Sequence, residues 1–430
     1  MKDKKLLLFG NTEKQPILHE MCALLEGDSS QARKKAPICL HAFLSMAGQT
    51  GFYGNLWNVF LTHILVVSEN SYTLSAECAG EAPKGTVRDF ALHDLAYFHS
   101  WMTVDLQALS QKTDVPEFRL IADYHAESTA GREYNVQVRE SICTLAVKLA
   151  ACPDPEAMLR TLDEFYLRYG VGTIGLHKAF RLDTSGGTGR IVPVSRIAEV
   201  GFDDLVGYED AKTVLKRNTE AFLIGAPANN CLLYGDAGTG KSSSIKALAN
   251  TYYSRGLRII EIYRHEFQYL NDIISQIKHR NYKFILYMDD LSFEEFETEY
   301  KYLKAVIEGG LEKKPENVLI YATSNRRHLI RESFNDKQKL SDDDVHRSDT
   351  VQEKLSLFDR FGVTIYYGAP TPLQYQEIVR TLAQREGITM PEEELLLLAN
   401  QWELKHAGYS GRTARQLVDD IIGRNAVREG

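Results

Sequence analysis

The feature that most constrains this chain is residues 235–242, GDAGTGKS, which fit the pattern G-x-x-x-x-G-K-[ST]. Glycines at this spacing let backbone N–H groups turn inward around phosphates, and a following helix adds the positive end of its dipole. The apolar run NCLLY precedes the segment, and a helical pattern that stops at Gly256 follows it. In this context we expect Lys241 to reach the β- and γ-phosphates of a nucleotide, and the Ser242 hydroxyl to bind Mg²⁺.

A second apolar run, residues 284–288, ends in two carboxylates, Asp289 and Asp290. The first acid at such a strand end suits the Mg²⁺ shell, directly or through water, and the second suits orienting or deprotonating an attacking water. The second acid is usually Glu, so the shorter Asp290 leaves the speed of hydrolysis open. Glu294 or Glu295 could share this role, but solvated acids at the start of the next helix are the favoured interpretation for both.

Three further polar residues follow in order. Asn325 ends a strand-like run, VLIYATS, where it could bond the attacking water or the γ-phosphate. Arg360 precedes the last apolar run and could reach a neighbouring subunit's γ-phosphate, a contact worth about 10³ to 10⁵ in rate in other enzymes. Arg412 would place a guanidinium over the nucleotide from a C-terminal lid, with Arg415 as the alternative. A helix cap or a surface ion pair could explain each alone, but their order after residues 235–242 favours one shared site.

The rhythm of apolar residues divides the 430-residue chain, whose length predicts about three folded units. From about residue 203, short β-branched runs alternate with helical stretches, which predicts a parallel sheet covered on both faces by helices. The five runs are 231–234, 257–262, 284–288, 318–321 and 363–367. We therefore expect a mainly helical N-terminal domain over 1–182, a linker over 183–202 marked by the loop-forming DTSGGTG, an α/β nucleotide-binding core over 203–368, and a helical lid over 369–430.

Residues 1–182 show helical spacing but no catalytic constellation. Segments 136–151 and 155–169 carry apolar residues at three- and four-residue spacing. Asp154 and Pro155 open the second segment with an N-cap followed by proline at the first helical position. The expected role of this half of the chain is to choose a protein partner.

Composition excludes several classes of protein. Hydrophobic residues at 44% and charged residues at 25% speak against long disorder. The formal charge of -8 argues against a basic nucleic-acid binder as a whole, although a local patch of basic residues is compatible with it.

Six cysteines without C-x-x-C pairing indicate buried thiols in a reducing cytoplasm. The apolar stretch 42–67 is interrupted by polar residues and predicts a core helix or two. We expect a soluble cytoplasmic protein without a membrane partner.

The order of these motifs resembles that of AAA+ ATPases over about residues 200–430. The resemblance implies a P-loop NTPase fold of AAA+ type, with the P-loop strand central in a five-stranded sheet. The segments DDLSFE, LKAVIEGGLE, YATSNRRHLI and EKLSLFDRFG further resemble one uncharacterised bacterial family of AAA+ proteins with a domain of unknown function. By this resemblance the Walker A, Walker B, sensor 1, arginine finger and sensor 2 motifs fall on 235–242, 284–290, Asn325, Arg360 and Arg412.

The resemblance also implies an ATP and Mg²⁺ site. Asp204-Leu-Val-Gly-Tyr208 resembles the segment that cups the adenine. Ser242 and Asp289 would bind the metal, and Asp290, Asn325 and Arg360 would be catalytic. The expected nucleotide-binding residues are Val206, Gly207, Gly235, Asp236, Ala237, Gly238, Thr239, Gly240, Lys241, Ser242, Ser243 and Arg412.

Two classes of function fit this site best. The first is an ATP-hydrolysing machine that acts as a homo-oligomer to remodel a macromolecular partner, because an arginine acting on a neighbour's nucleotide requires an assembly. The alternative is a nucleotide-gated binding module or DNA-associated loader with weak hydrolysis. Its support is a basic cluster at Arg326, Arg327, His328 and Arg331, for which ion pairing with the acidic residues 341–344 is the favoured interpretation.

A third and weaker hypothesis is a P-loop kinase that phosphorylates a small molecule. Protein-threading machines generally present an aromatic–hydrophobic–glycine loop after the second strand of the core. Residues 263–271, YRHEFQYLN, are aromatic at that place but lack the glycine, which speaks against an unfoldase.

Overall fold

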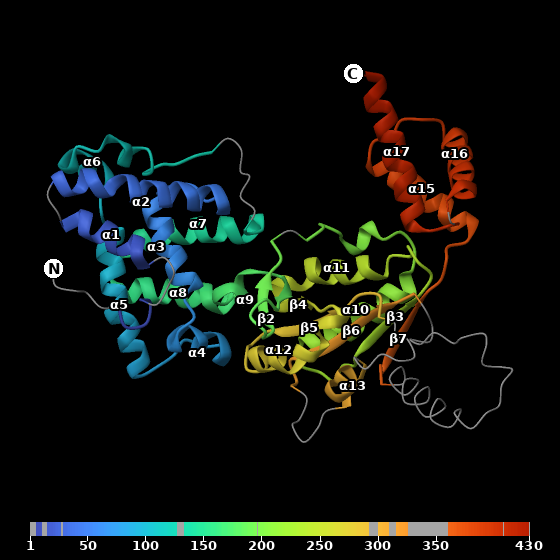
Figure 1. Ribbon diagram of the computed structural model, residues 1–430, viewed down its shortest axis with the longest axis horizontal. Coiled ribbons are helices and arrows are strands. Elements are labelled where there is room, and N and C mark those ends of the chain that lie inside the picture. The colour runs from blue at the N-terminus through green and yellow to red at the C-terminus, as the bar shows by residue number, and fades with distance from the viewer. Residues whose placement is uncertain are drawn as a thin grey trace. The chain divides into compact units, whose positions relative to one another are not determined.

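A computed structural model describes residues 6–10, 15–26, 29–126, 133–195, 197–291, 300–308, 315–325, 360–406 and 408–429 (Figure 1). The chain divides into two compact units. The N-terminal unit comprises Met1–Lys178, Pro193–Ile197 and His279–Asn281, and the second unit comprises Ala179–Val192, Ala198–Lys278 and Tyr282–Gly430. Each unit is described by itself below.

The described elements of the N-terminal unit are helices, beside an isolated antiparallel bridge between Gly54 and Tyr124. Its elements are α1 (Gln15–Glu26), α2 (Ser29–Thr50), α3 (Leu56–Val67), α4 (Ser71–Ala79), α5 (Thr86–Met102), α6 (Leu106–Thr113), the 3₁₀ helix η1 (Pro116–Arg119), α7 (Val136–Ala150), α8 (Pro155–Tyr169) and α9 (Gly172–Leu176). The apolar stretch 42–67 contributes the end of α2 and all of α3, and eleven residues of α3 are buried. Both helices expected at 136–151 and 155–169 are present, and the Asp154 side chain caps the second by accepting from Ala157 N at 2.7 Å.

None of the helices in the described ranges is long and apolar enough to cross a membrane. The six cysteines are free thiols: Cys39, Cys143 and Cys231 are buried and Cys78 is exposed. Their burial therefore fits the expected small-hydrophobe role for half of them.

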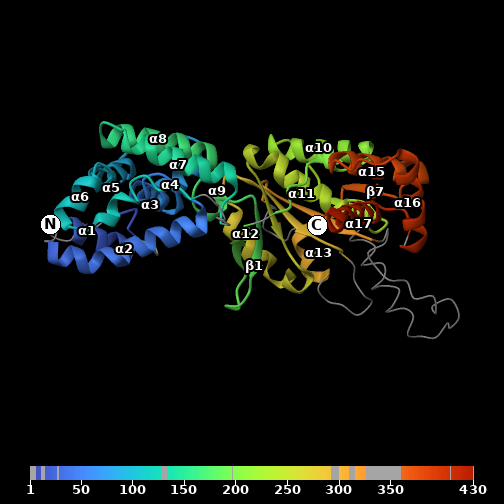
Figure 2. The same ribbon diagram turned by 90° about the horizontal axis from the view of Figure 1, so that it is seen from above.

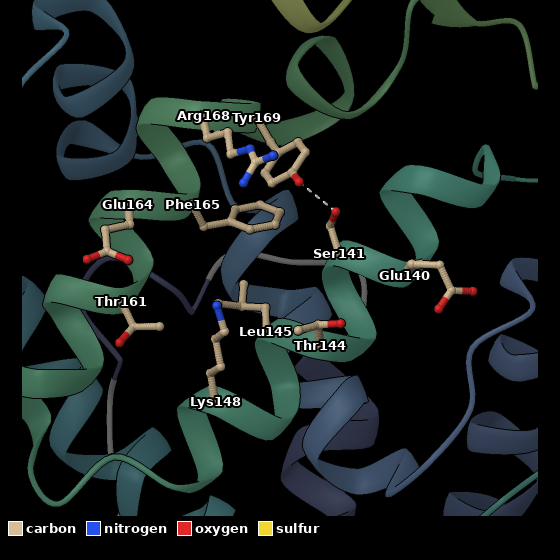
Figure 3. Close-up of a pocket in the computed structure, with 10 residues that line it drawn as sticks. All are labelled: Glu140, Ser141, Thr144, Leu145, Lys148, Thr161, Glu164, Phe165, Arg168 and Tyr169. Atoms are coloured by element: carbon tan, nitrogen blue, oxygen red, sulfur yellow. Dashed lines mark hydrogen bonds between the residues drawn. The ribbon is translucent and has the colours of Figure 1, made fainter.

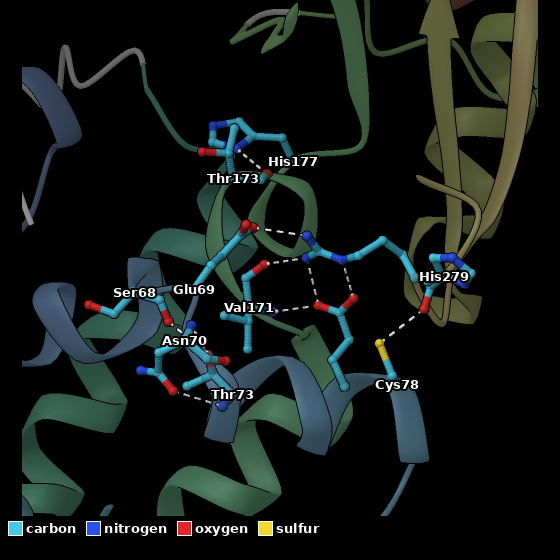
Figure 4. Close-up of polar contacts among 11 residues, drawn as sticks. Ser68, Glu69, Asn70, Thr73, Cys78, Val171, Thr173, His177 and His279 are labelled. Atoms are coloured by element: carbon cyan, nitrogen blue, oxygen red, sulfur yellow. Dashed lines mark hydrogen bonds and ion pairs between the residues drawn. The ribbon is translucent and has the colours of Figure 1, made fainter. Parts of the chain in front are cut away.

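The tripeptide His279–Asn281 belongs to the N-terminal unit by its contacts, although in the chain it follows α12. Arg280 donates from Nε and Nη2 to the Glu77 carboxylate at 2.5 and 2.8 Å, and from Nη1 to Glu69 Oε1 at 3.0 Å. Figure 4 shows the contacts around Glu69, Val171 and His279. These contacts fix the tripeptide to α4 and to Glu69, which precedes α4. A further hydrogen bond from Arg280 to the carbonyl of Val171 fixes it to the segment before α9.

The second unit is built on a seven-stranded sheet with the order β2-β1-β4-β5-β6-β3-β7. The strands are β1 (Ala179–Asp183), β2 (Arg190–Pro193), β3 (Cys231–Gly235), β4 (Leu257–Glu261), β5 (Lys283–Met288), β6 (Val318–Ser324) and β7 (Val363–Tyr367). All five strands expected from the apolar runs are present, and β4, β5, β6, β3 and β7 are mutually parallel. The P-loop strand β3 lies inside the sheet, between β6 and β7.

Two strands extend the sheet beyond the five expected. β1 pairs in parallel with β4, with Ala179 opposite Ile259 and Phe180 opposite Ile260. The sequence analysis placed a linker from residue 183, whereas the second compact unit begins at Ala179. A strand of five residues that buries only Phe180 and Leu182 carries too little periodicity to stand out from the helical pattern before it.

Helices cover both faces of the sheet (Figure 2). They are η2 (Phe202–Asp204), α10 (Glu209–Leu223), α11 (Lys241–Tyr252), η3 (Tyr253–Arg255), η4 (Arg264–Tyr269), α12 (Leu270–Ile277) and α13 (Tyr300–Glu308). Figure 2 shows α10 and α11 on one face and α12 and α13 on the other. Leu215 of α10 and Leu248 of α11 pack with Leu233 of β3 in one buried core.

The helical lid expected over 369–430 consists, in its described part, of α15 (Pro372–Arg385), α16 (Glu392–Lys405) and α17 (Gly411–Glu429). They enclose a core of their own, which includes Tyr375, Val379, Ala399 and Val418. The Thr371 side chain caps α15 and Pro372 follows as its first residue. The expected α/β fold class is confirmed: the chain has a largely parallel sheet flanked by helices, with a C-terminal helical lid and a mainly helical N-terminal domain.

Candidate active site

The loop between β3 and α11 has the backbone conformation that the glycine pattern predicts. Gly235, Gly238 and Gly240 have φ angles of 136°, 74° and 93°, which residues with a side chain rarely adopt. A Cβ at Gly235 would clash with the carbonyl oxygen of Tyr367 in β7. Only glycine therefore lets the loop leave the sheet at this point. Within the loop, the Thr239 hydroxyl donates to the Asp236 carbonyl at 2.8 Å.

Lys241 lies over this loop and is almost completely buried. Its Nζ donates to the carbonyl oxygens of Gly235 at 3.0 Å and Asp236 at 2.6 Å. Burial lowers the pKa of the Lys241 ammonium, while the nearby carboxylates of Asp236, Asp290 and Asp289 raise it in part. The ammonium thus sits beside the loop with backbone carbonyls as its partners, which are contacts that a phosphate could replace.

Asp289, directly after β5, is joined to the first turn of α11. Its Oδ1 accepts hydrogen bonds from Ser242 Oγ at 2.8 Å, Tyr287 OH at 2.7 Å and Thr323 Oγ1 at 2.6 Å. Partial burial alone would raise the pKa of the Asp289 carboxyl, but these three donors outweigh it and lower the pKa. The carboxylate is therefore stabilised in the ionised form that a cation requires.

Asp290 and Asn325, the two expected catalytic residues of neighbouring strands, are in contact. Asn325 Nδ2 donates to Asp290 Oδ1 at 2.8 Å. Asp290 has a φ of 49°, in the left-handed region, and its backbone N–H donates to Thr323 Oγ1 at 3.0 Å. Non-glycine residues in this region are uncommon and concentrate at functional sites. Both side chains are exposed at the carboxyl edge of the sheet.

Tyr287 and Thr323 are residues that the sequence analysis missed. Each precedes an expected site residue by two positions in its strand, Asp289 and Asn325 respectively. Because side chains alternate between the two faces of a strand, residues two apart point the same way. A hydroxyl side chain two positions before each expected site residue was therefore the sequence signal that could have identified Tyr287 and Thr323.

The lid contacts the P-loop through the N-terminus of α17. Arg412 N donates to the Gly238 carbonyl at 3.3 Å, and a Cβ at Gly238 would come within 2.9 Å of Ser410 Oγ. Ser410 also caps α17 by accepting from Thr413 N at 3.0 Å. Arg415, the alternative lid arginine, pairs instead with Glu386 at 2.6 Å and Asp419 at 2.9 Å. Of the two arginines, Arg412 is the one next to the P-loop.

A pocket of about 360 Å³ lies beside the P-loop, between the start of α10 and the start of α15. Val206 and Gly207, which were expected to contact the base, line it. Tyr208 fixes one wall, because its hydroxyl donates to the Gly368 carbonyl at 3.0 Å. Other lining residues, which the sequence analysis did not name, are Glu209, Asp210, Ala211, Tyr366, Pro370, Gln374, Glu377 and Ile378. Its lining combines apolar side chains such as Val206 and Ile378 with polar and charged ones, as small-molecule pockets generally do.

Asp236 connects this pocket to the phosphate loop. Its Oδ2 accepts from Ala369 N at 2.7 Å, and its backbone N–H donates to Tyr367 O at 3.0 Å. Asp236 therefore joins the P-loop to the segment that leads into the lid. The remaining expected residues, Ala237 and Ser243, lie in the loop and in the first turn of α11.

The structure does not bring Arg360 to the P-loop of its own chain. Arg360 is exposed and precedes β7, which pairs in parallel with β3 so that Val363 lies opposite Cys231 and Tyr367 opposite Gly235. The length of β7 alone separates the two edges by roughly 13 Å, at about 3.3 Å per residue. Arg360 is thus at the amino edge of the sheet, whereas the P-loop is at the carboxyl edge.

Several expected residues lie outside the described part of the chain. They are Glu294 and Glu295 after Asp290, the basic cluster Arg326, Arg327, His328 and Arg331, and the acidic residues 341–344. Among the described residues, no group of three or more His, Cys, Asp or Glu side chains could hold a metal by itself. Ser242 and Asp289 offer the hydroxyl and carboxylate oxygens that Mg²⁺ prefers, and further ligands would come from phosphate and water.

Two solved structures are similar to about half of this chain. The structure is similar to the RuvB Holliday junction branch migration motor of Thermotoga maritima, at 15% identity over 54% of this chain and 66% of that chain, with a TM-score of 0.38. It is also similar to the FIGL-1 AAA domain in complex with ADP, at 19% identity over 52% of this chain and 75% of that chain, with a TM-score of 0.34. The similarity thus spans about two thirds of the RuvB motor. A separate comparison with curated protein sequences found no match to the chain.

A family comparison covers more than half of the chain. Residues 175–425 match the family described as "Protein of unknown function (DUF815)". This range begins before β1 and ends within α17, so it takes in the sheet, the P-loop and the lid. The chain belongs to this family, DUF815.

Proposed function

We propose that this protein binds ATP with Mg²⁺ and hydrolyses it to ADP and phosphate. The observation that carries the proposal is the meeting of three groups at the carboxyl edge of β3, β5 and β6. These are the Lys241 ammonium over the P-loop, the Ser242–Asp289 pair, and the Asp290–Asn325 pair. A cation, a metal-binding pair and a pair that can orient water are the parts that phosphoryl transfer to water requires.

Binding would start at the phosphates. The N-terminus of α11 and the inward-turned backbone of the P-loop attract negative charge. Lys241 would exchange the carbonyls of Gly235 and Asp236 for phosphate oxygens, a stronger charge-assisted contact. The adenine would occupy the pocket lined by Val206, Gly207 and Ile378.

Ser242 and Asp289 would hold the Mg²⁺ ion. When bound, this ion would neutralise charge on the β- and γ-phosphates. The chain's own contribution is to keep Asp289 ionised and oriented, because Tyr287 and Thr323 both donate to its Oδ1. The Ser242 hydroxyl must give up its bond to Asp289 in order to become a ligand.

Asp290 and Asn325 would act on the attacking water. Asn325 Nδ2 already donates to Asp290 Oδ1, so the second oxygen of Asp290 can accept a proton from water. The amide oxygen of Asn325 could accept a hydrogen bond from the other hydrogen of this water and fix the direction of attack. Positioned acid–base groups of this kind typically contribute about 10² to 10⁴ in rate.

We further propose that the protein works as a homo-oligomer that remodels a macromolecular partner. Arg360 supports this proposal, because it lies at the amino edge of the sheet and cannot serve the nucleotide of its own chain. On a neighbouring subunit it could stabilise charge at the γ-phosphate. The N-terminal unit, whose described elements are helices, would bind the partner.

The test is release of inorganic phosphate from ATP and Mg²⁺ by the full chain without any added acceptor. We expect steady release, loss of nucleotide binding in Lys241→Ala, and no change in Lys246→Ala, which alters an exposed lysine on the same helix. A kinase would release little phosphate without its acceptor. Failure of the unmodified protein to bind ATP, or unchanged hydrolysis by Lys241→Ala, would refute the proposal.

A further inference from the structure

A groove of about 260 Å³ lies between α7 and α8 of the N-terminal unit (Figure 3). Both helices contribute residues at three- and four-residue spacing, so the groove runs along their facing sides. Its walls include Ser141, Thr144 and Lys148 from α7, and Phe165, Arg168 and Tyr169 from α8.

The base of the groove is aromatic and held in place. The rings of Phe165 and Tyr169 are 4.9 Å apart at an interplanar angle of 37°. The Tyr169 hydroxyl accepts from Ser141 Oγ at 2.8 Å, which ties the two helices together. An aromatic surface with a fixed polar edge can receive a large apolar side chain without rearranging.

Two cations border this aromatic surface. Arg168 lies with its guanidinium carbon 5.2 Å from the centre of the Tyr169 ring, and Figure 3 shows the Lys148 amine next to Leu145, between the helices. Within the described ranges, neither Lys148 nor Arg168 forms an ion pair with a carboxylate of the chain. Both charges can therefore serve an incoming anion.

The two acids of the groove do not neutralise these cations. Glu140 accepts from the Tyr53 hydroxyl through one oxygen and from Arg139 Nη2 at 2.9 Å through the other. The hydrogen bond from Tyr53 is the main reason that the pKa of Glu140 is lowered. Figure 3 shows the Glu164 carboxylate directed away from Phe165. The groove thus presents positive charge inward and negative charge at its margin.

We propose that this groove binds an acidic peptide segment of a protein partner. A Glu or Asp carboxylate of the peptide would lie between Lys148 and Arg168, and a neighbouring large apolar side chain would pack on the half-buried ring of Tyr169, which Phe165 supports from below. The proposal names the class of partner, and it does not depend on ATP hydrolysis by the other unit.

A peptide fits this surface better than a nucleic-acid strand does. A strand carries a phosphate at every nucleotide and needs a continuous track of cations. The groove offers two cations only, and Glu140 and Glu164 would meet the next phosphates on either side. A peptide with an acidic side chain beside an apolar one can contact the two cations with its carboxylate and the aromatic surface with its apolar side chain. It does not bring a continuous row of negative charges past Glu140 and Glu164.

The experiment selects displayed random 12-residue peptides on the immobilised full chain, and then measures a fluorescein-labelled selected peptide by anisotropy. We expect enrichment of Asp or Glu next to a large apolar residue, and affinity that falls as salt is added. The double variant Lys148→Glu/Arg168→Glu should bind the same labelled peptide at least about tenfold more weakly, because like charges facing each other oppose binding.

The matched control is Lys84→Glu/Arg119→Glu, which reverses two exposed cations elsewhere in the same unit and should bind like the unmodified protein. Selected peptides that are basic or uncharged would overturn the proposal. So would equal affinity of the groove variant and the control, or displacement of the peptide by single-stranded DNA at a lower concentration than by unlabelled peptide. ATP hydrolysis by the groove variant at the unmodified rate would show that a loss of peptide binding is independent of the proposed ATPase activity.

Discussion

The Ser242 hydroxyl donates a 2.8 Å hydrogen bond to Asp289 Oδ1 and so joins the first turn of α11 to the end of β5. The same oxygen accepts from Tyr287 and Thr323. Three hydroxyl donors thus satisfy the carboxylate oxygen that a cation would otherwise neutralise. The Ser242 hydroxyl, at the end of the P-loop, can give up its hydrogen bond to Asp289 when nucleotide binds. The hydroxyls of Tyr287 and Thr323 belong to strands of the sheet and keep their hydrogen bonds to Asp289.

Removing the two sheet hydroxyls should weaken metal binding. We expect Tyr287→Phe/Thr323→Val to reduce the affinity of the ADP-bound protein for Mn²⁺, a probe for Mg²⁺, by about 10- to 100-fold, as loss of residues that orient metal ligands generally does. Electron paramagnetic resonance of bound Mn²⁺ measures this directly. Tyr321→Phe is the control, because Tyr321 is equally buried in β6 but bonds Asn218 and Thr219. Unchanged Mn²⁺ affinity in the double variant would contradict the role assigned to these hydroxyls.

Changing Asp290 should separate nucleotide binding from hydrolysis. Asp290→Asn keeps the size of the side chain but removes the oxygen that accepts a proton, so we expect ATP to bind while hydrolysis falls by about 10² to 10⁴. Filter binding of labelled ATP and phosphate release measure the two quantities. Asn325→Ala should lower the same rate, and the double variant should lose little more, because the two residues act as one pair. Rapid hydrolysis by Asp290→Asn would refute the assignment.

The lid arginines should differ in effect. Arg412 lies at the P-loop and Arg415 pairs with Glu386 and Asp419 on the lid itself. We expect Arg412→Ala to weaken ATP binding or hydrolysis by about tenfold or more, since it removes a charge at the phosphate end of the site. Arg415→Ala should change only stability, by roughly 1 kcal/mol or less, as for an exposed ion pair. If the two variants bind ATP with equal affinity and hydrolyse it at equal rates, Arg412 has no role in the site.

Much of the fold could be predicted from sequence because its buried strands are continuous apolar runs. β3, β4, β5 and β6 are buried along almost their whole length, so each has a run of apolar residues that stands out between helices. β7 alternates between buried and exposed residues, but its β-branched and aromatic residues favour a strand. β1 could not be predicted, because it buries only Phe180 and Leu182. β2 has four residues, all exposed or half-buried, and it follows a glycine-rich loop that resembled a linker. Strands as short as these are defined by pairing with a neighbour, which only the folded chain shows.

The site shows a similar division. The spacing of Lys241, Ser242 and Asp289 followed from the P-loop pattern and from the acid after an apolar strand. The choice between Arg412 and Arg415 did not, because residues three apart on a helix face the same side. The contact of Arg412 N with the Gly238 carbonyl and the ion pairs of Arg415 with lid carboxylates distinguish the two. Contacts between distant parts of the chain, such as Asp236 with Ala369, leave no local pattern.

The ion pair between Arg280 and Glu77 should be important for stability. The Arg280 side chain is 8% exposed and that of Glu77 is 3% exposed, so loss of one partner would leave a buried charge. We expect Arg280→Met to lower the free energy of unfolding by about 3 kcal/mol or more, and Arg280→Met/Glu77→Leu to recover part of that loss. Denaturant unfolding of the full chain measures both. A double variant less stable than the single one would show that other contacts of Arg280, such as the carbonyl of Val171, dominate.

Arg360 should act on the nucleotide of another subunit. Lys241→Ala removes nucleotide binding and keeps Arg360, whereas Arg360→Ala keeps the nucleotide site and removes the arginine. Alone, each variant should hydrolyse ATP slowly. Mixed in equal amounts, they should regain activity, because an intact site of one variant can meet the arginine of the other.

Random mixing around a head-to-tail assembly gives such a pairing at about a quarter of the interfaces, so recovery should approach roughly a quarter of the unmodified rate. Phosphate release over a range of protein concentrations measures it, and the recovered rate should rise with concentration as subunits assemble. A mixture of Lys241→Ala with Lys241→Ala/Arg360→Ala is the matched control and should stay inactive. If the Arg360→Ala protein alone hydrolyses ATP at the unmodified rate, independent of concentration, Arg360 has no role in trans and the exposed position before β7 serves another purpose.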